Sequence, residues 1–181
     1  MSAKGIRDID VIRTFVLQGT LNFTRYFFKI RQKRKFVIGK HHREIAAALD
    51  KVLCGEITRL IINIAPRYGK TELAVKNFIA EGLAINPKAK FIHLSYSDDL
   101  ARDNSRGVQD IINEPEYRRI FPATIPTSTN TKKWYTTEGG GLYAVSSAGQ
   151  VTGFGAGLVD EEENDELAKE VEELDLSLIH I

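Results

Sequence analysis

Cysteine is almost absent from this chain, and the single Cys54 has no partner with which to form a disulfide. A disulfide framework and a cysteine-based zinc site are therefore excluded, and a reducing compartment suits the sequence. No apolar run approaches the roughly 18 to 20 residues that span a bilayer, and the N-terminus lacks a secretory pattern. The histidines at 41, 42, 93 and 180 are too scattered to suggest a metal site. These absences predict a soluble, intracellular protein.

The length of 181 residues fits one domain, and a hydrophobic content of 43% is enough to bury a core. The net charge of +1 hides two unequal parts. Residues 160–181 carry ten acids and one base, Lys169, which leaves 24 bases against 14 acids in residues 1–159. The first part is basic enough to attract a polyanion. The acidic part is interpreted as a solvated helix or an insertion.

The most basic stretch covers residues 25–43, with eight bases and no acid. Four aromatic residues lie within it: Tyr26, Phe27, Phe28 and Phe36. Aromatic rings among bases can stack on nucleobases while the cations meet phosphates. The simpler interpretation places the rings in the core and the bases in water. We adopt it for the aromatic residues and leave DNA contact by the bases open.

Helical spacing of apolar residues predicts helices over residues 8–17, 42–54, 72–85 and 98–113. Ser97 stands where its side chain can cap the last of these helices. Two short apolar runs, residues 60–64 and 90–96, are typical of strands, the first of a strand buried in a parallel sheet.

The part that follows contains three prolines, at positions 115, 122 and 126, and predicts an irregular stretch with a surface loop over residues 127–131. Residues 134–137 and 142–146 flank three consecutive glycines and predict a hairpin. The alternation of strands and helices predicts an α/β fold with right-handed crossovers.

Residues 60–71 join the first predicted strand to a tight loop and then to Gly69-Lys70-Thr71 at a helix start. Nucleotide phosphates need several converging backbone N–H groups, and a helix N-terminus supplies them with a favourable dipole. Gly69 allows close approach of the backbone. Lys70 would contact the β- and γ-phosphates of ATP, and the Thr71 hydroxyl would bind Mg²⁺.

The loop departs from the usual phosphate-binding pattern, G-x-x-x-x-G-K-[ST], because Ile64 stands where the first glycine is expected. Pro66 could supply part of the fixed turn geometry instead. An isolated G-K-T is often only a helix start, but the predicted strand before it and the helix after it favour a phosphate site.

Several segments together resemble the large subunit of viral terminases, those of tailed bacteriophages. Residues 63–72 (NIAPRYGKTE) look like the deviant Walker A loop of that family, with a proline and an arginine ahead of G-K-[ST]. Upstream, residues 39–42 (GKHH) and 55–60 (GEITRL) are similar to the family's approach to this loop. Downstream, three segments are similar to recurrent family segments: 94–101 (LSYSDDLA), 115–122 (PEYRRIFP) and 149–157 (GQVTGFGAG). The resemblance covers roughly residues 25–157.

The resemblance implies an α/β, RecA-like P-loop NTPase with a mainly parallel sheet flanked by helices, incomplete in this chain. It divides the chain into a basic helical lead-in (1–59), a partial ATPase core (60–159) and an acidic tail (160–181). Arg67 would lie near the γ-phosphate, where it could stabilise developing charge; a helix-start arginine bound to a carboxylate is the alternative. The residues implied to bind ATP are His42, Pro66, Arg67, Tyr68, Gly69, Lys70, Thr71 and Glu72.

Hydrolysis by this family also needs a Walker B motif, an acid that holds Mg²⁺ at the end of an apolar strand, followed by a glutamate that activates water. Two placements remain open. In the first, Asp160 binds the metal and Glu161 is the base. In the second, residues 160–175 are a charged insertion and the motif lies beyond Ile181. The further acids after Glu161 favour the second placement.

By the resemblance, the intact protein would be an ATPase motor that drives double-stranded DNA into a preformed capsid. It would work in the host cytoplasm, transiently at the portal vertex, as a homo-oligomeric ring with the portal protein and a small terminase subunit as partners and no membrane. The chain is too short to include the nuclease domain of full terminases. Two alternatives remain: another P-loop DNA-dependent ATPase, such as a helicase-like or repair enzyme, and an inactive nucleic-acid-binding remnant.

Overall fold

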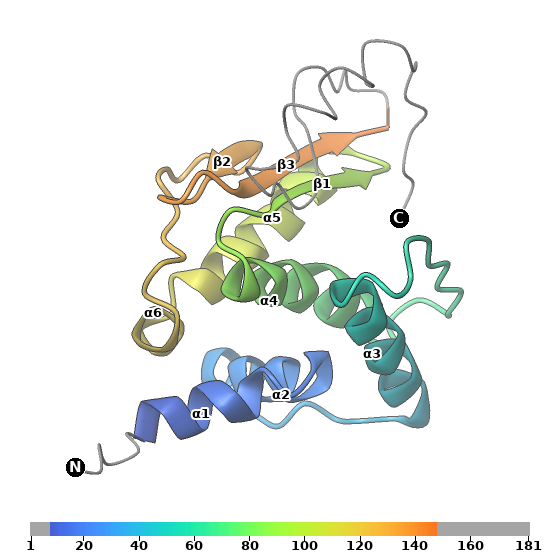
Figure 1. The fold of residues 1–181 in the computed structure, drawn as a ribbon. Coiled ribbons are helices and arrows are strands. Elements are labelled where there is room, and N and C mark those ends of the chain that lie inside the picture. The colour runs from blue at the N-terminus through green and yellow to red at the C-terminus, as the bar shows by residue number, and fades with distance from the viewer. Residues whose placement is uncertain (1–7, 148–181) are drawn as a thin grey trace, which may run out of the picture.

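Ten elements of secondary structure follow one another in residues 8–147, the part of the chain that this computed structural model describes (Figure 1). They are α1 (Asp8–Val16), α2 (Thr20–Gln32), α3 (Lys40–Leu53), the π-helix η1 (Glu72–Asn77), α4 (Phe78–Ile85), β1 (Lys90–Ser95), α5 (Asp98–Ile112), α6 (Pro115–Ile120), β2 (Lys133–Tyr135) and β3 (Gly141–Ser146). The described residues therefore form a mixed α/β structure.

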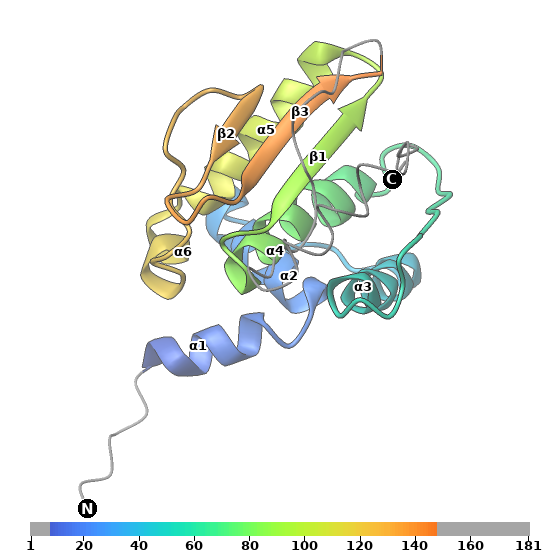
Figure 2. The ribbon, with the colours of Figure 1, turned by 45° about the horizontal axis from the view of Figure 1, so that its top comes forward.

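The three strands form one sheet in the order β1-β3-β2. β1 and β3 are parallel, with Lys90 opposite Gly141 and Ser95 opposite Ser146, and β2 is antiparallel to β3. The sheet is thus mixed, whereas the sequence predicted a mainly parallel one. Helix α5 covers one of its faces, and α4 packs beside α5 (Figure 2). Helices α1, α2 and α3 pack beyond them, so that the described helices all lie on one side of the sheet.

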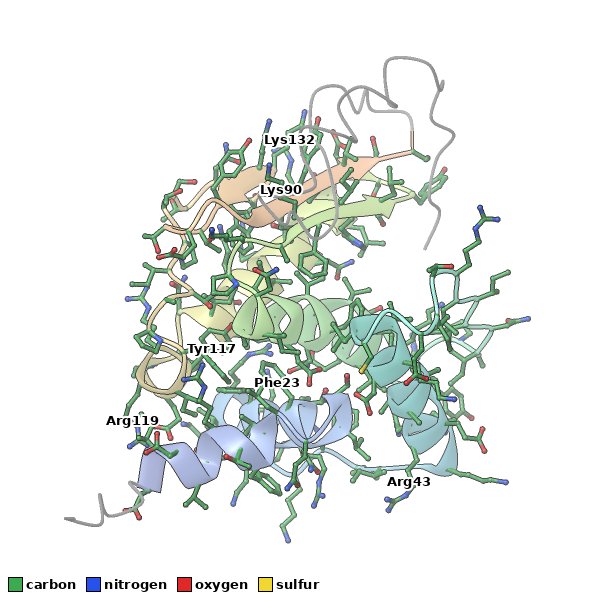
Figure 3. All side chains as sticks on the ribbon, in the orientation of Figure 1. Phe23, Arg43, Lys90, Tyr117, Arg119 and Lys132 are labelled. Carbon is green, nitrogen blue, oxygen red and sulfur yellow. The ribbon has the colours of Figure 1, made fainter. Side chains whose placement is uncertain are left out.

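Aromatic side chains fill the contact between α2 and α6. Phe23 and Phe27 are fully buried with ring centroids 4.6 Å apart, and Tyr117 meets them at 6.2 and 5.3 Å (Figure 3). The Tyr117 hydroxyl donates to the Ala80 carbonyl at 2.8 Å, so its buried polar atom is satisfied. Each such ring contributes roughly 2 kcal/mol of apolar burial, with a further fraction from edge-on ring contacts.

Several predicted elements are confirmed. The four helices appear within a few residues of their expected bounds, as do the strand at β1 and the hairpin of β2 and β3. The Ser97 side chain accepts a hydrogen bond from the Leu100 N–H at 3.2 Å, as expected for a cap. Of the aromatic residues in 25–43, Phe27 is in the core and Tyr26 packs against it, which agrees with the simpler interpretation.

The prediction of a strand at residues 60–64 was wrong. These residues have no regular secondary structure, and Ile61 is 93% exposed. A strand exists through hydrogen bonds to a neighbour, and no described residue bonds to the backbone of residues 58–65. The apolar, β-branched composition favours a strand, but no segment in residues 8–147 pairs with it.

Helix α6 was also missed, because Pro115 was taken as a sign of irregular structure. Proline is well tolerated in the first turn of a helix, where its missing N–H is not needed. Here it opens the helix, and the buried Tyr117 and Ile120 hold that helix on the core.

A buried carboxyl group lies inside the helical layer. Glu81 on α4 is 1% exposed, and its Oε2 atom has no hydrogen-bond partner among the described residues. Burial, together with the nearby Asp50 carboxylate, raises the pKa of Glu81 to about 8. The side chain is therefore largely protonated at neutral pH.

Glu81→Gln tests this buried proton. Because the folded pKa lies above the unfolded one, the stability that Glu81 contributes is complete below pH 4.5 and is lost as the pH rises toward 8. The free energy of unfolding of wild type minus that of the variant should fall by about 1.4 kcal/mol per pH unit over this window. Urea unfolding at several pH values measures it, and a difference that stays flat between pH 5 and 8 contradicts the assignment.

Candidate phosphate-binding loop

The loop before η1 has an unusual backbone. Arg67 and Gly69 both adopt left-handed conformations, with φ of 68° and 76°, and the helix begins at Lys70. Alternation of right- and left-handed residues turns successive N–H groups toward one side, which forms a concave site for anions. A non-glycine residue with positive φ is uncommon and costs about 1 kcal/mol or more, so the strain at Arg67 requires support from its surroundings.

The N–H groups of this loop are available to a ligand. The first backbone hydrogen bond of the helix runs from the Leu73 N–H to the Gly69 carbonyl at 3.0 Å. Within residues 8–147, no hydrogen bond engages the N–H groups of residues 67–72. N–H groups without partners at a helix N-terminus, together with the helix dipole, can bind an anion such as a phosphate group.

His42 connects the loop to α3 through a hydrogen bond to the Tyr68 carbonyl. Its Nδ1 accepts from the Gly39 N–H at 2.9 Å, so the proton lies on Nε2, which donates to the Tyr68 carbonyl at 3.0 Å. His42 is the third residue of α3 and takes the place of the Glu or Gln of a capping box. The side chain is only 7% exposed, and it connects the start of α3 to the loop.

The protonation state of His42 follows from these contacts. Burial, and secondarily the neighbouring His41, lower the pKa of His42 below its usual value. The ring is therefore neutral at pH 7, as its accepting Nδ1 requires. Its contribution to stability is present above pH 6.5 and is lost as the pH falls through the lowered pKa.

A series of ring contacts runs from α2 to the loop. Phe28 meets Phe36 at 5.2 Å, Phe36 meets His42 at 4.9 Å, His42 meets His41 at 3.9 Å, and His41 meets Tyr68 at 5.5 Å between centroids. We call these five residues the ring series. It fixes the loop relative to α2, because each ring restricts the next.

The predicted nucleotide ligands divide into two groups. The first group, Pro66, Arg67, Tyr68, Lys70 and Thr71, is exposed, so a ligand can reach these residues. Glu72 instead turns inward. Its Oε1 atom accepts from Arg31 Nη1 at 3.0 Å and from Asn77 Nδ2 at 3.1 Å.

Asn77 explains the π-helix that follows the loop. Its Nδ2 donates to the Glu72 carbonyl at 2.7 Å, five residues earlier, which stabilises the wider turn. The Arg31–Glu72 pair is mostly buried and ties this turn to α2. Arg31 and Asn77 were not among the residues predicted from the sequence, since no local pattern distinguishes an arginine that points inward.

An apolar cavity of about 450 Å³ lies beside Lys70. It is lined by Leu49 and Val52 of α3, by residues 58–62, by Ala74 and Val75 of η1 and by Phe78 of α4. Three of its lining residues, 60–62, come from the segment that was predicted to be a strand. Its apolar walls place a non-polar surface next to the exposed Lys70 side chain.

Asp160 and Glu161, the predicted Walker B residues, lie outside the described residues. Within residues 8–147, no three His, Cys, Asp or Glu side chains gather as metal ligands would. None of the helices in this range has both the length and the apolar character needed to cross a bilayer. Comparisons with protein families, with curated proteins and with solved structures gave no match.

Gly69→Ala should destabilise the protein for two separable reasons. An alanine at φ 76° is strained, and its Cβ would lie 2.8 Å from His42 Nε2. We expect a loss of about 1–3 kcal/mol in the free energy of unfolding, measured by urea titration.

The double variant Gly69→Ala/His42→Ala separates these reasons. Removal of the imidazole relieves the contact but not the backbone strain. The loss of unfolding free energy in the double variant should therefore be smaller than the sum of the losses in Gly69→Ala and His42→Ala. Strict additivity would show that His42 does not lie against Gly69.

Proposed function

We propose that this chain is the nucleotide-binding part of an ATPase motor, with the RecA-like fold of the terminase large subunits that it resembles. One observation carries the proposal: a strained loop is left-handed at Arg67 and Gly69 and presents the N–H groups of residues 67–72, which have no partner in residues 8–147, at the start of the helix that continues into α4. A loop that served only to begin a helix would not need a left-handed arginine. An anion in the concavity gives this conformation a use.

The side chains around the loop suit Mg·ATP. Lys70 is exposed at the first turn and would contact the β- and γ-phosphates, while the Thr71 hydroxyl would bind Mg²⁺. Bound Mg²⁺ would neutralise charge on the phosphates and orient them. Arg67 is exposed in the loop and has no carboxylate partner among the described residues, which favours the phosphate role over the structural one.

The residues that could contact adenine differ from those that the resemblance implied. His42, which the resemblance assigned to the nucleotide, instead binds the Tyr68 carbonyl and holds the loop in place. His41 and Tyr68 are more accessible and offer ring faces near the site. His42 is therefore a positioning residue in this proposal.

In the intact protein, hydrolysis would drive double-stranded DNA through a homo-oligomeric ring docked on a portal, with a small terminase subunit as partner. These roles, and action in the host cytoplasm, come from the resemblance. The base and the second Mg²⁺ ligand would be Glu161 and Asp160. A different P-loop DNA-dependent ATPase would share the same loop and is the second candidate.

Mg·ATP binding by calorimetry, on the wild-type chain and on Lys70→Ala, tests the proposal. Loss of a charge-assisted contact should weaken binding by about tenfold or more. Lys51→Ala, an exposed lysine in the last turn of α3, is the matched control and should bind as wild type does.

Hydrolysis is assayed in parallel. Turnover that depends on Asp160 and Glu161 would assign them as the Walker B pair, whereas turnover that survives their replacement would exclude them from that role. Absence of binding by a folded wild-type chain would refute the nucleotide site.

A further inference from the structure

Seven exposed bases lie within residues 25–43. They come from α2, from the connection 33–39 and from the first turn of α3, where Figure 3 labels Arg43. We call them the basic surface: Arg25, Lys29, Lys33, Arg34, Lys35, Lys40 and Arg43. The eighth base of the run, Arg31, is the exception, because Glu72 binds it inside the protein.

The aromatic residues of the same run are engaged elsewhere. Phe27 is buried, and the Tyr26 hydroxyl donates to Glu116 Oε1 at 2.8 Å. Phe28 and Phe36 belong to the ring series, with the Arg34 guanidinium 5.8 Å from the Phe28 centroid. The exposed bases, rather than these partly or fully buried rings, are therefore the groups best placed to meet a partner.

Few acids neutralise these bases. Among the described residues, the ion pair recorded for the seven is Lys40 with Glu44, at 3.8 Å and exposed, and such pairs contribute little. Asp110 and Glu114 line a shallow depression with Arg31 and Gln32, at the end of α2. The surface thus retains a strong positive charge.

The spacing of the bases suits a regular polyanion. Arg25, Lys29 and Lys33 follow at intervals of four, so they lie along one side of α2 about 6 Å apart. Lys33 is the C-cap of α2 and has φ 54°, which turns the chain into the connection that carries Arg34 and Lys35. A lipid surface would favour apolar side chains that insert beside the bases, and the described part of the run exposes one such residue, Val37.

We propose that the basic surface binds the phosphate backbone of a duplex nucleic acid. The binding is sequence-independent, since phosphate contacts carry no base information. Its position matters for the proposed motor, because the first turn of α3 contributes Lys40 and Arg43 to this surface and His42 to the loop. A use in ATP-driven transport rests on the proposed function, whereas the binding itself does not.

Fluorescence anisotropy with labelled 30-base-pair DNA of two unrelated sequences, without nucleotide, tests the proposal. The variant Lys33→Gln/Arg34→Gln/Lys35→Gln removes three bases from the connection. The control, Arg102→Gln/Arg106→Gln/Arg118→Gln, removes the same charge from exposed positions on α5 and α6. Circular dichroism of both variants checks that the fold is kept.

We expect wild type to bind both DNA sequences equally. In the first variant, the affinity should fall by about tenfold or more, and the slope of log affinity against log salt should decrease by about 3. The control should stay near wild type, and the first variant should still bind Mg·ATP. Equal weakening of both variants would mean that only net charge matters, and would overturn the surface. Binding to anionic vesicles but not to duplex DNA would overturn it as well.

Discussion

The burial of α4 is the constraint on which the rest of the described structure depends. Every residue from Phe78 to Ala84 is buried, so of this helix only its last residue, Ile85, is exposed. On one side Gly82 lies so close to the Phe91 ring of β1 that a Cβ there would be 2.5 Å from it. On the other side Tyr117 and Thr124 donate to the carbonyls of Ala80 and Leu83. A helix held from all directions fixes the position of its own N-terminal end.

That end is the candidate site. The helix runs without a break from Lys70 through η1 to Ile85, so the loop lies at the N-terminal end of the helix that α4 anchors in the core. Arg31 and Asn77 fix Glu72 in the first turn, and His42 fixes the Tyr68 carbonyl. A loop pre-organised in this way loses little conformational freedom when it binds an anion. The buried contacts of the helix therefore fix the backbone positions of Lys70 and Thr71.

The basic surface and the loop share the start of α3. His42 faces the loop while Lys40 and Arg43 face solvent, and the ring series extends the same connection to α2. Two anionic partners, a nucleotide and a nucleic acid, would thus meet neighbouring parts of one small element. This proximity fits the proposed nucleic-acid-dependent ATPase.

The sequence predicted the helices with clear periodicity and the loop with its Gly69-Lys70-Thr71, because those signals are local. It did not predict that residues 60–64 lack a strand partner, since pairing depends on segments far along the chain. The resemblance assigned Glu72 and His42 to the nucleotide. It could not show that their side chains contact Arg31, Asn77 and Gly39 instead, because these partners lie outside the short motif. The left-handed Arg67 could not be inferred either, since arginine rarely adopts it.

Backbone amide NMR during titration with Mg·ATP tests the central claim most directly. If the free N–H groups bind phosphates, the amide signals of residues 67–72 should show the largest shifts, with smaller changes at Gly39 and His42 beneath the loop. Shifts confined to the basic surface, or spread evenly over the protein, would show that the nucleotide binds only as a general anion. Such a result would contradict the account of this loop as a nucleotide site.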